Sequence, residues 1–149
     1  MNVLIAVDGL PTSRQAIEFA HSLLAGQQVS VLLFHVIPQH LVYGKGGAAP
    51  AEVYDLPKER TASREILDEC AQQLQAAGVD LTVETRVGIG DPAELILSAA
   101  ADNDADLIVL GSRGLSAAQR FLIGSVSTKV VTHAHCPVLV VHPKTSAAK

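Results

Sequence analysis

Residues 107–127, LIVLGSRGLSAAQRFLIGSVS, decide the architecture of this chain. The apolar run 107–110 lies between Asp106 and Gly111 and predicts a buried strand. Gly124 and Ser125 then precede apolar residues at helical spacing, which predicts a helix over residues 125–133. Glycine lets a backbone approach a ligand closely, and the first turn of a helix offers free N–H groups to an anion. The stretch therefore predicts a strand that leads into a loop able to wrap a polyphosphate.

The candidate ligand-contacting residues of this stretch lie at the strand end, in the loop and at the helix start. They are Leu110, Gly111, Ser112, Arg113, Gly114, Gly124, Ser125, Val126 and Ser127. The serines add hydroxyl donors, and Arg113 or Arg120 could pair with phosphate oxygens. Two alternatives stay open: the glycines only make turns, and Arg120 is a solvated surface side chain.

The rest of the chain alternates between strand and helix patterns. Apolar runs predict further strands at residues 3–7, 29–36 and 138–141, and alternation of apolar and polar residues predicts one at residues 79–87. Apolar residues at helical spacing predict helices after Ser13, over residues 59–77 and from Pro92 onwards, with Ser13 and Asp91 as N-caps. The alternation predicts one domain over residues 1–149, an α/β doubly wound fold with a five-stranded parallel sheet and helices on both faces. Residues 38–57 are expected to form a long loop, either a lid or a plain surface loop, and residues 144–149 a polar tail.

The expected strand order is 3-2-1-4-5, so the chain reverses direction between the first and fourth strands. Open α/β sheets bind ligands at such a switch point, at the carboxyl ends of the strands. The first strand ends in Ala6, Val7 and Asp8, and the fourth ends at Gly111. The topology and the glycine pattern therefore point to one crevice. The alternative for Asp8 is a turn-forming residue before Gly9.

Composition excludes several classes of function. The chain has 149 residues with 48% hydrophobic and 17% charged residues, which is typical of a globular domain. A net charge of −4 disfavours nucleic-acid binding, and with no Trp and few aromatics a base-stacking surface is not expected. The apolar run 3–7 is too short for a signal peptide or a membrane span. Cys70 and Cys136 form no CxxC pair and look like small core residues of a reduced compartment. Together with the short apolar run, this leads us to expect a cytoplasmic protein without membrane insertion.

The glycine pattern is neither a Walker loop nor a G-x-G-x-x-G fingerprint. The pattern Gly111-x2-Gly114-x9-Gly124-Ser125 resembles the nucleotide signature of the universal stress protein family, in its ATP-binding branch. The resemblance extends to residues 5–9 (IAVDG) with Ser13, to residues 90–92 (GDP) and to residues 133–141 (HAHCPVLVV). One departure is Leu10, which stands where the family often has a serine.

The resemblance implies a ligand and an assembly. It implies an ATP site, with Mg²⁺, in which Asp8 contacts the ligand and Val36 lines the base pocket. It also implies a homodimer in which residues 138–141 of two chains pair, and the apolar edge strand predicted there supports this. The expected function is a nucleotide-dependent stress-response regulator that acts on an unidentified protein partner. A third possibility is a partner-binding dimer that has lost its nucleotide. The intact glycine pattern disfavours it.

An enzyme is the alternative, either a slow ATPase or an autophosphorylating protein with Ser112 or Ser125 as acceptor. Phosphoryl transfer needs a positioned nucleophile and charge neutralisation, and the sequence offers neither a Walker lysine nor an obvious base beyond Asp8. His133, His135, Cys136 and His142 do not have the spacing of a zinc finger, so no metal site is assigned to them.

Overall fold

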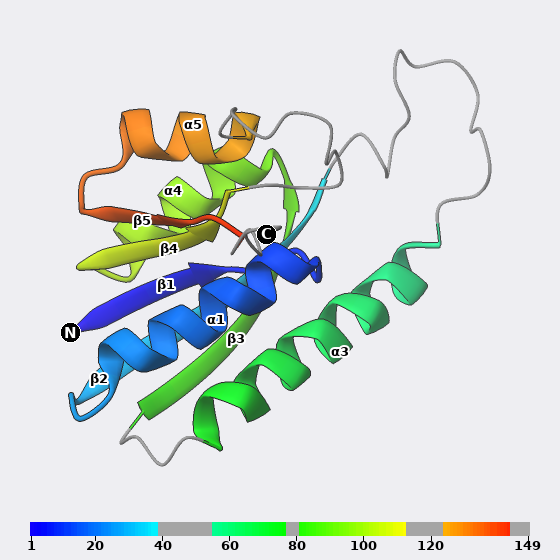
Figure 1. The fold of residues 1–149 in the computed structure, drawn as a ribbon. Helices are drawn as coiled ribbons and strands as arrows, with labels where there is room; N and C mark the ends of the chain where they lie inside the picture. The colour runs from blue at the N-terminus through cyan, green and yellow to red at the C-terminus, as the bar shows by residue number, and fades with distance from the viewer. Residues whose placement is uncertain (39–54, 77–80, 113–123, 144–149) are drawn as a thin grey trace, which may run out of the picture.

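The computed structural model of the chain describes residues 1–38, 55–76, 81–112 and 124–143. The strands are β1 (Asn2–Ala6), β2 (Val29–Pro38), β3 (Leu81–Gly90), β4 (Leu107–Gly111) and β5 (Val138–Val141). The helices are α1 (Pro11–Leu24), α3 (Leu56–Gln75), α4 (Pro92–Asp102) and α5 (Ser125–His133). Strands and helices alternate along the described chain, as the sequence predicts (Figure 1).

All five strands form one parallel sheet in the order β3-β2-β1-β4-β5. Central β1 pairs with β2 on one side and with β4 on the other, so that Ile5 lies between Leu33 and Val109. The predicted fold class and strand order are therefore confirmed. The order reverses between β1 and β4, and this is where a doubly wound sheet opens a crevice.

Two buried clusters fill the two sides of the sheet. On one side α1 and α3 pack against residues of alternating strand positions, such as Val3, Ile5 and Leu33. On the other side α4 and α5 cover the intervening positions, such as Leu4 and Ile108. Figure 1 shows α1 and α3 in front of the sheet and α4 and α5 on the opposite side. Strands that are apolar on both faces require this double cover.

The start of α1 differs from the prediction. The helix begins at Pro11, and its N-cap is Leu10, which provides no side-chain cap. The predicted cap, Ser13, is the third helical residue, and its hydroxyl donates to the Leu10 carbonyl at 2.9 Å. Proline explains the shift, because its fixed φ suits the first helical position and it has no N–H to satisfy.

Strands β2 and β3 both run past their predicted ends. They pair up to the register positions Val36 with Gly88 and Pro38 with Gly90. A Cβ at Gly88 would lie 2.9 Å from Cζ of Phe34, so glycine leaves room for that ring. Residue 38 therefore belongs to β2, and residues 56 and 57 belong to α3 with Asp55 as its N-cap, rather than to the predicted loop. Residues 39–54 of that loop and the predicted tail over residues 144–149 lie outside the described residues.

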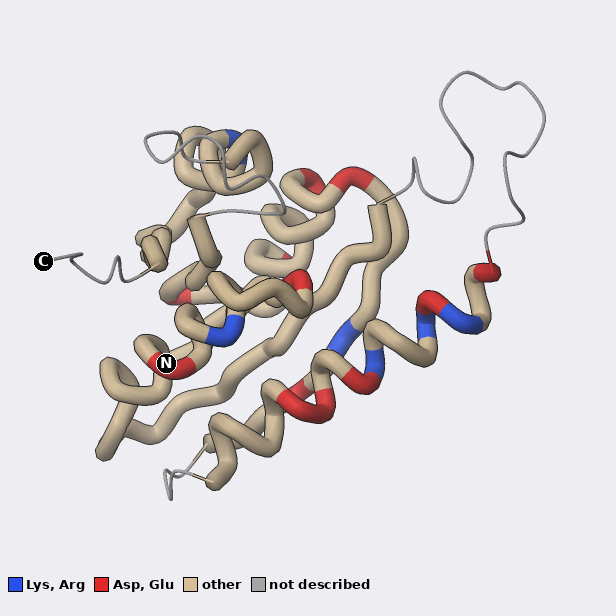
Figure 2. Tube along the Cα trace, turned by 45° about the vertical axis from the view of Figure 1, so that its right-hand side comes forward, with Lys and Arg blue, Asp and Glu red and all other residues tan. Residues whose placement is uncertain are grey.

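Charged residues concentrate on the helices, α3 above all, and are sparse in the strands (Figure 2). Within the described ranges, no helix combines the length and the apolar character that crossing a membrane requires.

Candidate functional site

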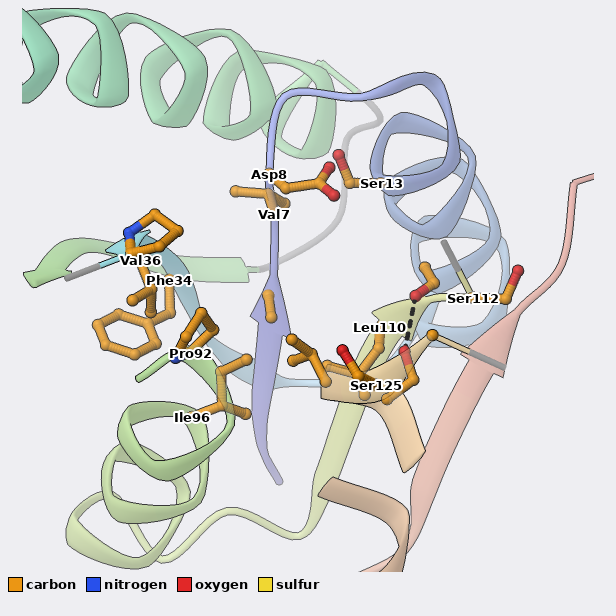
Figure 3. Close-up of a pocket in the computed structure, with 16 residues that line it drawn as sticks. Val7, Asp8, Ser13, Phe34, Val36, Pro92, Ile96, Leu110, Ser112 and Ser125 are labelled. Carbon is orange, nitrogen blue, oxygen red and sulfur yellow. Dashed lines mark hydrogen bonds between the residues drawn. The ribbon is translucent and has the colours of Figure 1, made fainter. Parts of the chain in front are cut away.

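A cavity of about 390 Å³ opens at the carboxyl ends of β1, β2 and β4, where the strand order reverses. Its described lining residues come from these strand ends and from the starts of α1, α4 and α5 (Figure 3). They are Ala6, Val7, Asp8, Ser13, Phe34, Val36, Pro38, Pro92, Ile96, Leu110, Gly111, Ser112, Gly124, Ser125, Val126 and Ser127.

One wall of the cavity is apolar. It is formed by Phe34, Val36 and Pro38 of β2 together with Pro92 and Ile96 of α4. Figure 3 shows four of these side chains gathered on the side of the cavity away from Ser112. A flat hydrophobic group such as a nucleobase would contact only carbon atoms of these side chains. This wall suits the apolar part of a ligand.

The loop after β1 supplies a polar corner. Oδ1 of Asp8 accepts a hydrogen bond from the Leu10 N–H at 2.9 Å, which fixes the carboxylate at the cavity. Ser13, whose hydroxyl donates to the Leu10 carbonyl, lines the cavity as well. Among the described lining residues Asp8 is the charged one. Its turn-forming interaction and its position at the cavity are thus compatible, so the two alternatives for this residue are not exclusive.

The start of α5 forms the opposite wall. Gly124 is its N-cap, with no side-chain cap hydrogen bond, and the next three residues line the cavity. The wall is tied to β4, because the Gly124 N–H donates to the Ser112 carbonyl at 3.0 Å and the Ser127 hydroxyl donates to the Gly111 carbonyl at 3.1 Å. A helix start without a side-chain cap offers N–H groups and positive potential to an anion.

Ser112 is fully buried at the foot of this wall. Its N–H donates to the Val141 carbonyl at 2.9 Å, so β5 holds the residue in place. Its hydroxyl finds no partner in the part of the chain that the structure describes. A buried hydroxyl without a partner is costly, and this makes Ser112 an unexplained polar group next to the cavity.

The floor of the cavity is fixed at Val7. Its N–H donates to the Phe34 carbonyl at 2.9 Å, and its carbonyl is 2.9 Å from Nδ1 of His35. Since a carbonyl only accepts, Nδ1 of His35 carries the proton. Burial lowers the pKa of His35, while the Val7 hydrogen bond and the nearby carboxylate of Asp8 act against that decrease. The imidazole therefore acts as a neutral brace beneath the cavity.

The structure brings together all the described residues that the sequence selected. Those of β1, β2, β4 and α5 line the one cavity. Arg113, Gly114 and Arg120 lie outside the described residues. One glycine has an additional role: a Cβ at Gly111 would lie 3.0 Å from the Thr12 carbonyl carbon, so this glycine also permits close packing of β4 against α1.

Sequence reasoning missed the apolar wall. Phe34 and Pro38 lie two residues before and after the selected Val36, so all three share one face of β2, and this two-residue repeat was the available signal. Pro92 and Ile96 come from α4, where the sequence analysis noted a capped helix and a resemblance at residues 90–92 but selected no ligand-contacting residue. Their position follows from the topology. Helix α4 begins directly after the carboxyl end of β3, and the carboxyl ends of all five parallel strands lie on the side of the sheet where the cavity opens.

The four residues considered for a metal site do not form one. Nδ1 of His133 lies 2.9 Å from the Lys129 carbonyl within α5. Cys136 is half-buried, and burial raises the pKa of its thiol. Over the described ranges, no three His, Cys, Asp or Glu side chains gather in a way that could hold a metal ion.

The topology and the cavity define an open, doubly wound α/β protein with a ligand crevice at its switch point. The sequence profile of the Universal stress protein family matches residues 1–142. The chain belongs to this family.

Individual relatives agree along almost the whole chain. A universal stress protein of Synechocystis sp. is 32% identical, with 93% of this chain and 96% of that protein covered. The solved structure of universal stress protein UspA from Lactobacillus plantarum is 25% identical with a TM-score of 0.80, covering 95% of this chain and 97% of that one. A universal stress protein solved in complex with cAMP is 25% identical with a TM-score of 0.70, covering 95% and 96%.

Proposed function

We propose that the cavity binds an adenine nucleotide and that the chain is a nucleotide-dependent regulator. The observation that carries the proposal is the two-sided cavity: an apolar wall faces a helix start that has no side-chain cap. A nucleotide has the same division into an apolar base and an anionic phosphate group. The cAMP bound to the related structure supports this class of ligand.

The proposed orientation follows from the two walls. The base lies against Phe34, Val36 and Ile96, and the phosphates lie at the N–H groups of Ser125 and Val126. Helix N-termini bind phosphate through both their free N–H groups and their dipole. The cavity volume of about 390 Å³ falls within the ordinary range of small-molecule sites.

We infer that ATP, rather than AMP, is the preferred ligand and that Mg²⁺ accompanies it. The described lining carries the Asp8 carboxylate and offers oxygen ligands there and on Ser13. Mg²⁺ prefers oxygen ligands and takes only one or two from the protein when phosphates supply the others. Bound between Asp8 and the phosphates, it would neutralise charge that the carboxylate otherwise repels.

Calorimetric titration tests the ligand. ATP, AMP and cAMP are each titrated with and without Mg²⁺, and the tightest binding is expected for ATP with Mg²⁺. Adenosine and GTP serve as controls for the phosphates and the base. Absence of binding for every adenine nucleotide at millimolar concentration would contradict the proposal. Chromatography of the same samples for ADP checks the alternative of slow hydrolysis.

The proposed assembly is a homodimer through β5. Among the described strands it pairs only with β4, and its four residues are apolar and half-buried. Next to it lies a groove of about 520 Å³ between β5 and α1, lined by Leu139, Val141 and the half-exposed Phe19. An apolar edge strand of this kind favours pairing with another strand.

A substitution in β5 tests the dimer. Val140→Pro removes a backbone donor and introduces a ring that a paired strand does not tolerate. Sedimentation is expected to show the variant as a monomer and the unsubstituted chain as a dimer. A dimer that survives in a folded Val140→Pro variant would place the interface elsewhere.

The regulatory role predicts that a protein partner recognises one nucleotide state. Affinity capture with the immobilised chain, with and without ATP and Mg²⁺, is expected to retain the partner in one condition only. Equal retention in both conditions would argue against a switch.

A further inference from the structure

The two helices that wall the cavity are joined by one lysine. Lys129 of α5 forms ion pairs with two carboxylates of α4, at 3.4 Å to Oδ1 of Asp91 and at 3.3 Å to Oε1 of Glu94. Both helices begin at the cavity: α4 contributes Pro92 and Ile96, and α5 contributes the residues after Gly124. The ion pairs therefore connect the base wall to the phosphate wall.

The contact lies close to both helix starts. Lys129 is four residues after Ser125, so it stands one turn beyond the first residue of α5. Asp91 is the N-cap of α4, and the same Oδ1 that contacts Lys129 accepts from the Glu94 N–H at 2.9 Å. One carboxylate oxygen thus fixes the first turn of α4 and is held by α5. The hydrogen bond to Glu94 and the contacts with Asp91 raise the pKa of Lys129, so its ammonium stays charged.

Helices α4 and α5 share one buried cluster, to which α4 contributes three alanines, at residues 93, 99 and 100, together with Ile96. Val130 of α5 is fully buried in one cluster with Ala93 and Ala100 of α4. Alanine presents a single methyl group, so it interlocks less with a facing helix than a larger side chain does. A polar contact at the cavity end then has more influence on how the two helices are placed relative to each other.

We propose that Lys129 is a positioning residue that sets the separation of the two cavity walls and so the affinity for the ligand. This inference rests on the proposed function, because it concerns the same site. Lys129 does not line the cavity among its described residues, so it acts through α4 and α5 and not by contact. When the ion pairs are absent, the base wall and the phosphate wall fit the ligand less closely, and the ordering of the helices adds to the cost of binding.

The alternative is that Lys129 turns away from α4 and contacts phosphate directly. The two roles differ in their dependence on the ligand. A positioning role weakens adenosine and ATP by a similar factor, because the walls serve both ligands. A direct contact weakens ATP strongly and leaves adenosine unchanged, because adenosine has no phosphate.

The test compares Lys129→Met, Lys129→Arg and Arg14→Met by calorimetric titration with adenosine, ATP and Mg²⁺. Methionine keeps much of the apolar stem, arginine keeps the charge, and Arg14→Met breaks the equally exposed ion pair with Glu69 on the other side of the sheet. Because exposed ion pairs are weak, Lys129→Met is expected to weaken both ligands about two- to fivefold. Lys129→Arg is expected to restore most of the affinity, and Arg14→Met to leave it unchanged. A loss confined to ATP, or no loss at all, would overturn the proposal.

A measurement without ligand separates this inference from the proposed function. Amide hydrogen exchange of α5 is expected to be faster in Lys129→Met than in the unsubstituted chain, and unchanged in Arg14→Met. Unchanged exchange in Lys129→Met would overturn the positioning role. If exchange increases while the unsubstituted chain binds no adenine nucleotide, the proposed function fails and the coupling of the two helices stands.

Discussion

Helices α4 and α5 both begin at the cavity, but their first turns are satisfied in different ways. In α4 the carboxylate of Asp91 accepts from the Glu94 N–H at 2.9 Å, so the helix carries its own anion. In α5 the N-cap is Gly124, which has no side chain to accept such a bond. The two helices therefore differ at the cavity: α4 carries an acidic side-chain cap, whereas the first-turn N–H groups of α5 have no side-chain acceptor, an arrangement that favours an anion.

The first way to break this comparison is to make α5 resemble α4. Gly124→Asp places a carboxylate at the N-cap, where it accepts from the first-turn N–H groups and repels a phosphate. We expect nucleotide affinity to fall at least about tenfold, by the loss of these N–H contacts, while the unliganded chain becomes slightly more stable. Calorimetry and thermal melts measure the two effects.

Gly124→Asn is the matched control for charge, because asparagine is also a good N-cap. It is expected to retain more affinity than Gly124→Asp. If both variants bind ATP as well as the unsubstituted chain does, the phosphates do not lie at α5.

The second prediction compares the effect on stability of adding a side chain at Gly111 and at Gly124. A Cβ at Gly111 would lie 3.0 Å from the carbonyl carbon and 3.1 Å from the carbonyl oxygen of Thr12, whereas a Cβ at Gly124 would meet only the Ser112 carbonyl oxygen, at 3.3 Å. Gly111→Ala is therefore expected to cost about 1–3 kcal/mol through overpacking. Gly124→Ala should leave the melting temperature nearly unchanged. Equal losses in calorimetric melts would show that both glycines are structural.

The third prediction removes the cap of α4. Asp91→Ala is expected to destabilise the chain by about 1 kcal/mol, the usual cost of losing an N-cap. Asp91→Asn should lose less, because the amide oxygen still accepts from Glu94. Denaturant titration measures both variants, and a cost of Asp91→Asn equal to that of Asp91→Ala would mean that charge, not capping, matters here.

The pH dependence of that cap follows from the pKa of Asp91. The hydrogen bond from the Glu94 N–H lowers this pKa, with a further contribution from Lys129. The stabilisation is therefore present above the ordinary carboxyl pKa and is lost as the pH falls through the lowered value. Asp91→Asn is expected to remove this part of the acid sensitivity.

The smallest expected effect lies at the floor between the two walls. Burial lowers the pKa of His35, so the unfolded chain binds a proton more readily than the folded one. The contribution of neutral His35 is therefore complete above the ordinary histidine pKa and is lost as the pH falls below it. Melts between neutral pH and mildly acidic pH should show a smaller decrease in His35→Asn than in the unsubstituted chain. An equal decrease would assign that sensitivity to another group.

The sequence was sufficient for the sheet and for most of the described cavity. Four apolar runs and one alternating segment predicted the five strands, and their alternation with helical patterns predicted the doubly wound fold. Asp8 and Gly111 could be placed together because the ends of neighbouring parallel strands meet at one edge of a sheet. The limits of α5 and β5 were also predicted correctly, since Ser125 and Val138 each begin a clear pattern.

The start of α1 and the end of β3 were predicted wrongly, because at each position two sequence signals favour different structures. Ser13 has the side chain of an N-cap, but Pro11 starts the helix two residues earlier. The strand pattern appeared to end at Val87 because glycine has low strand propensity, yet Gly88 stays in β3 to make room for the Phe34 ring. Packing between elements that are distant in the chain decides such cases, and a local pattern contains no information on it.

That pair has a consequence for how the cavity can change. The Phe34 ring fills the space that a side chain at residue 88 would need, since the two would be 2.9 Å apart. The sizes of the residues at positions 34 and 88 therefore together determine how deep the apolar recess is. A larger residue at position 88 requires a smaller one at position 34. With a small residue at 34 and a large one at 88, the open space would lie over β2 instead of β3. If an adenine base occupies this recess, a smaller residue at position 34 would make room for an enlarged analogue of that base.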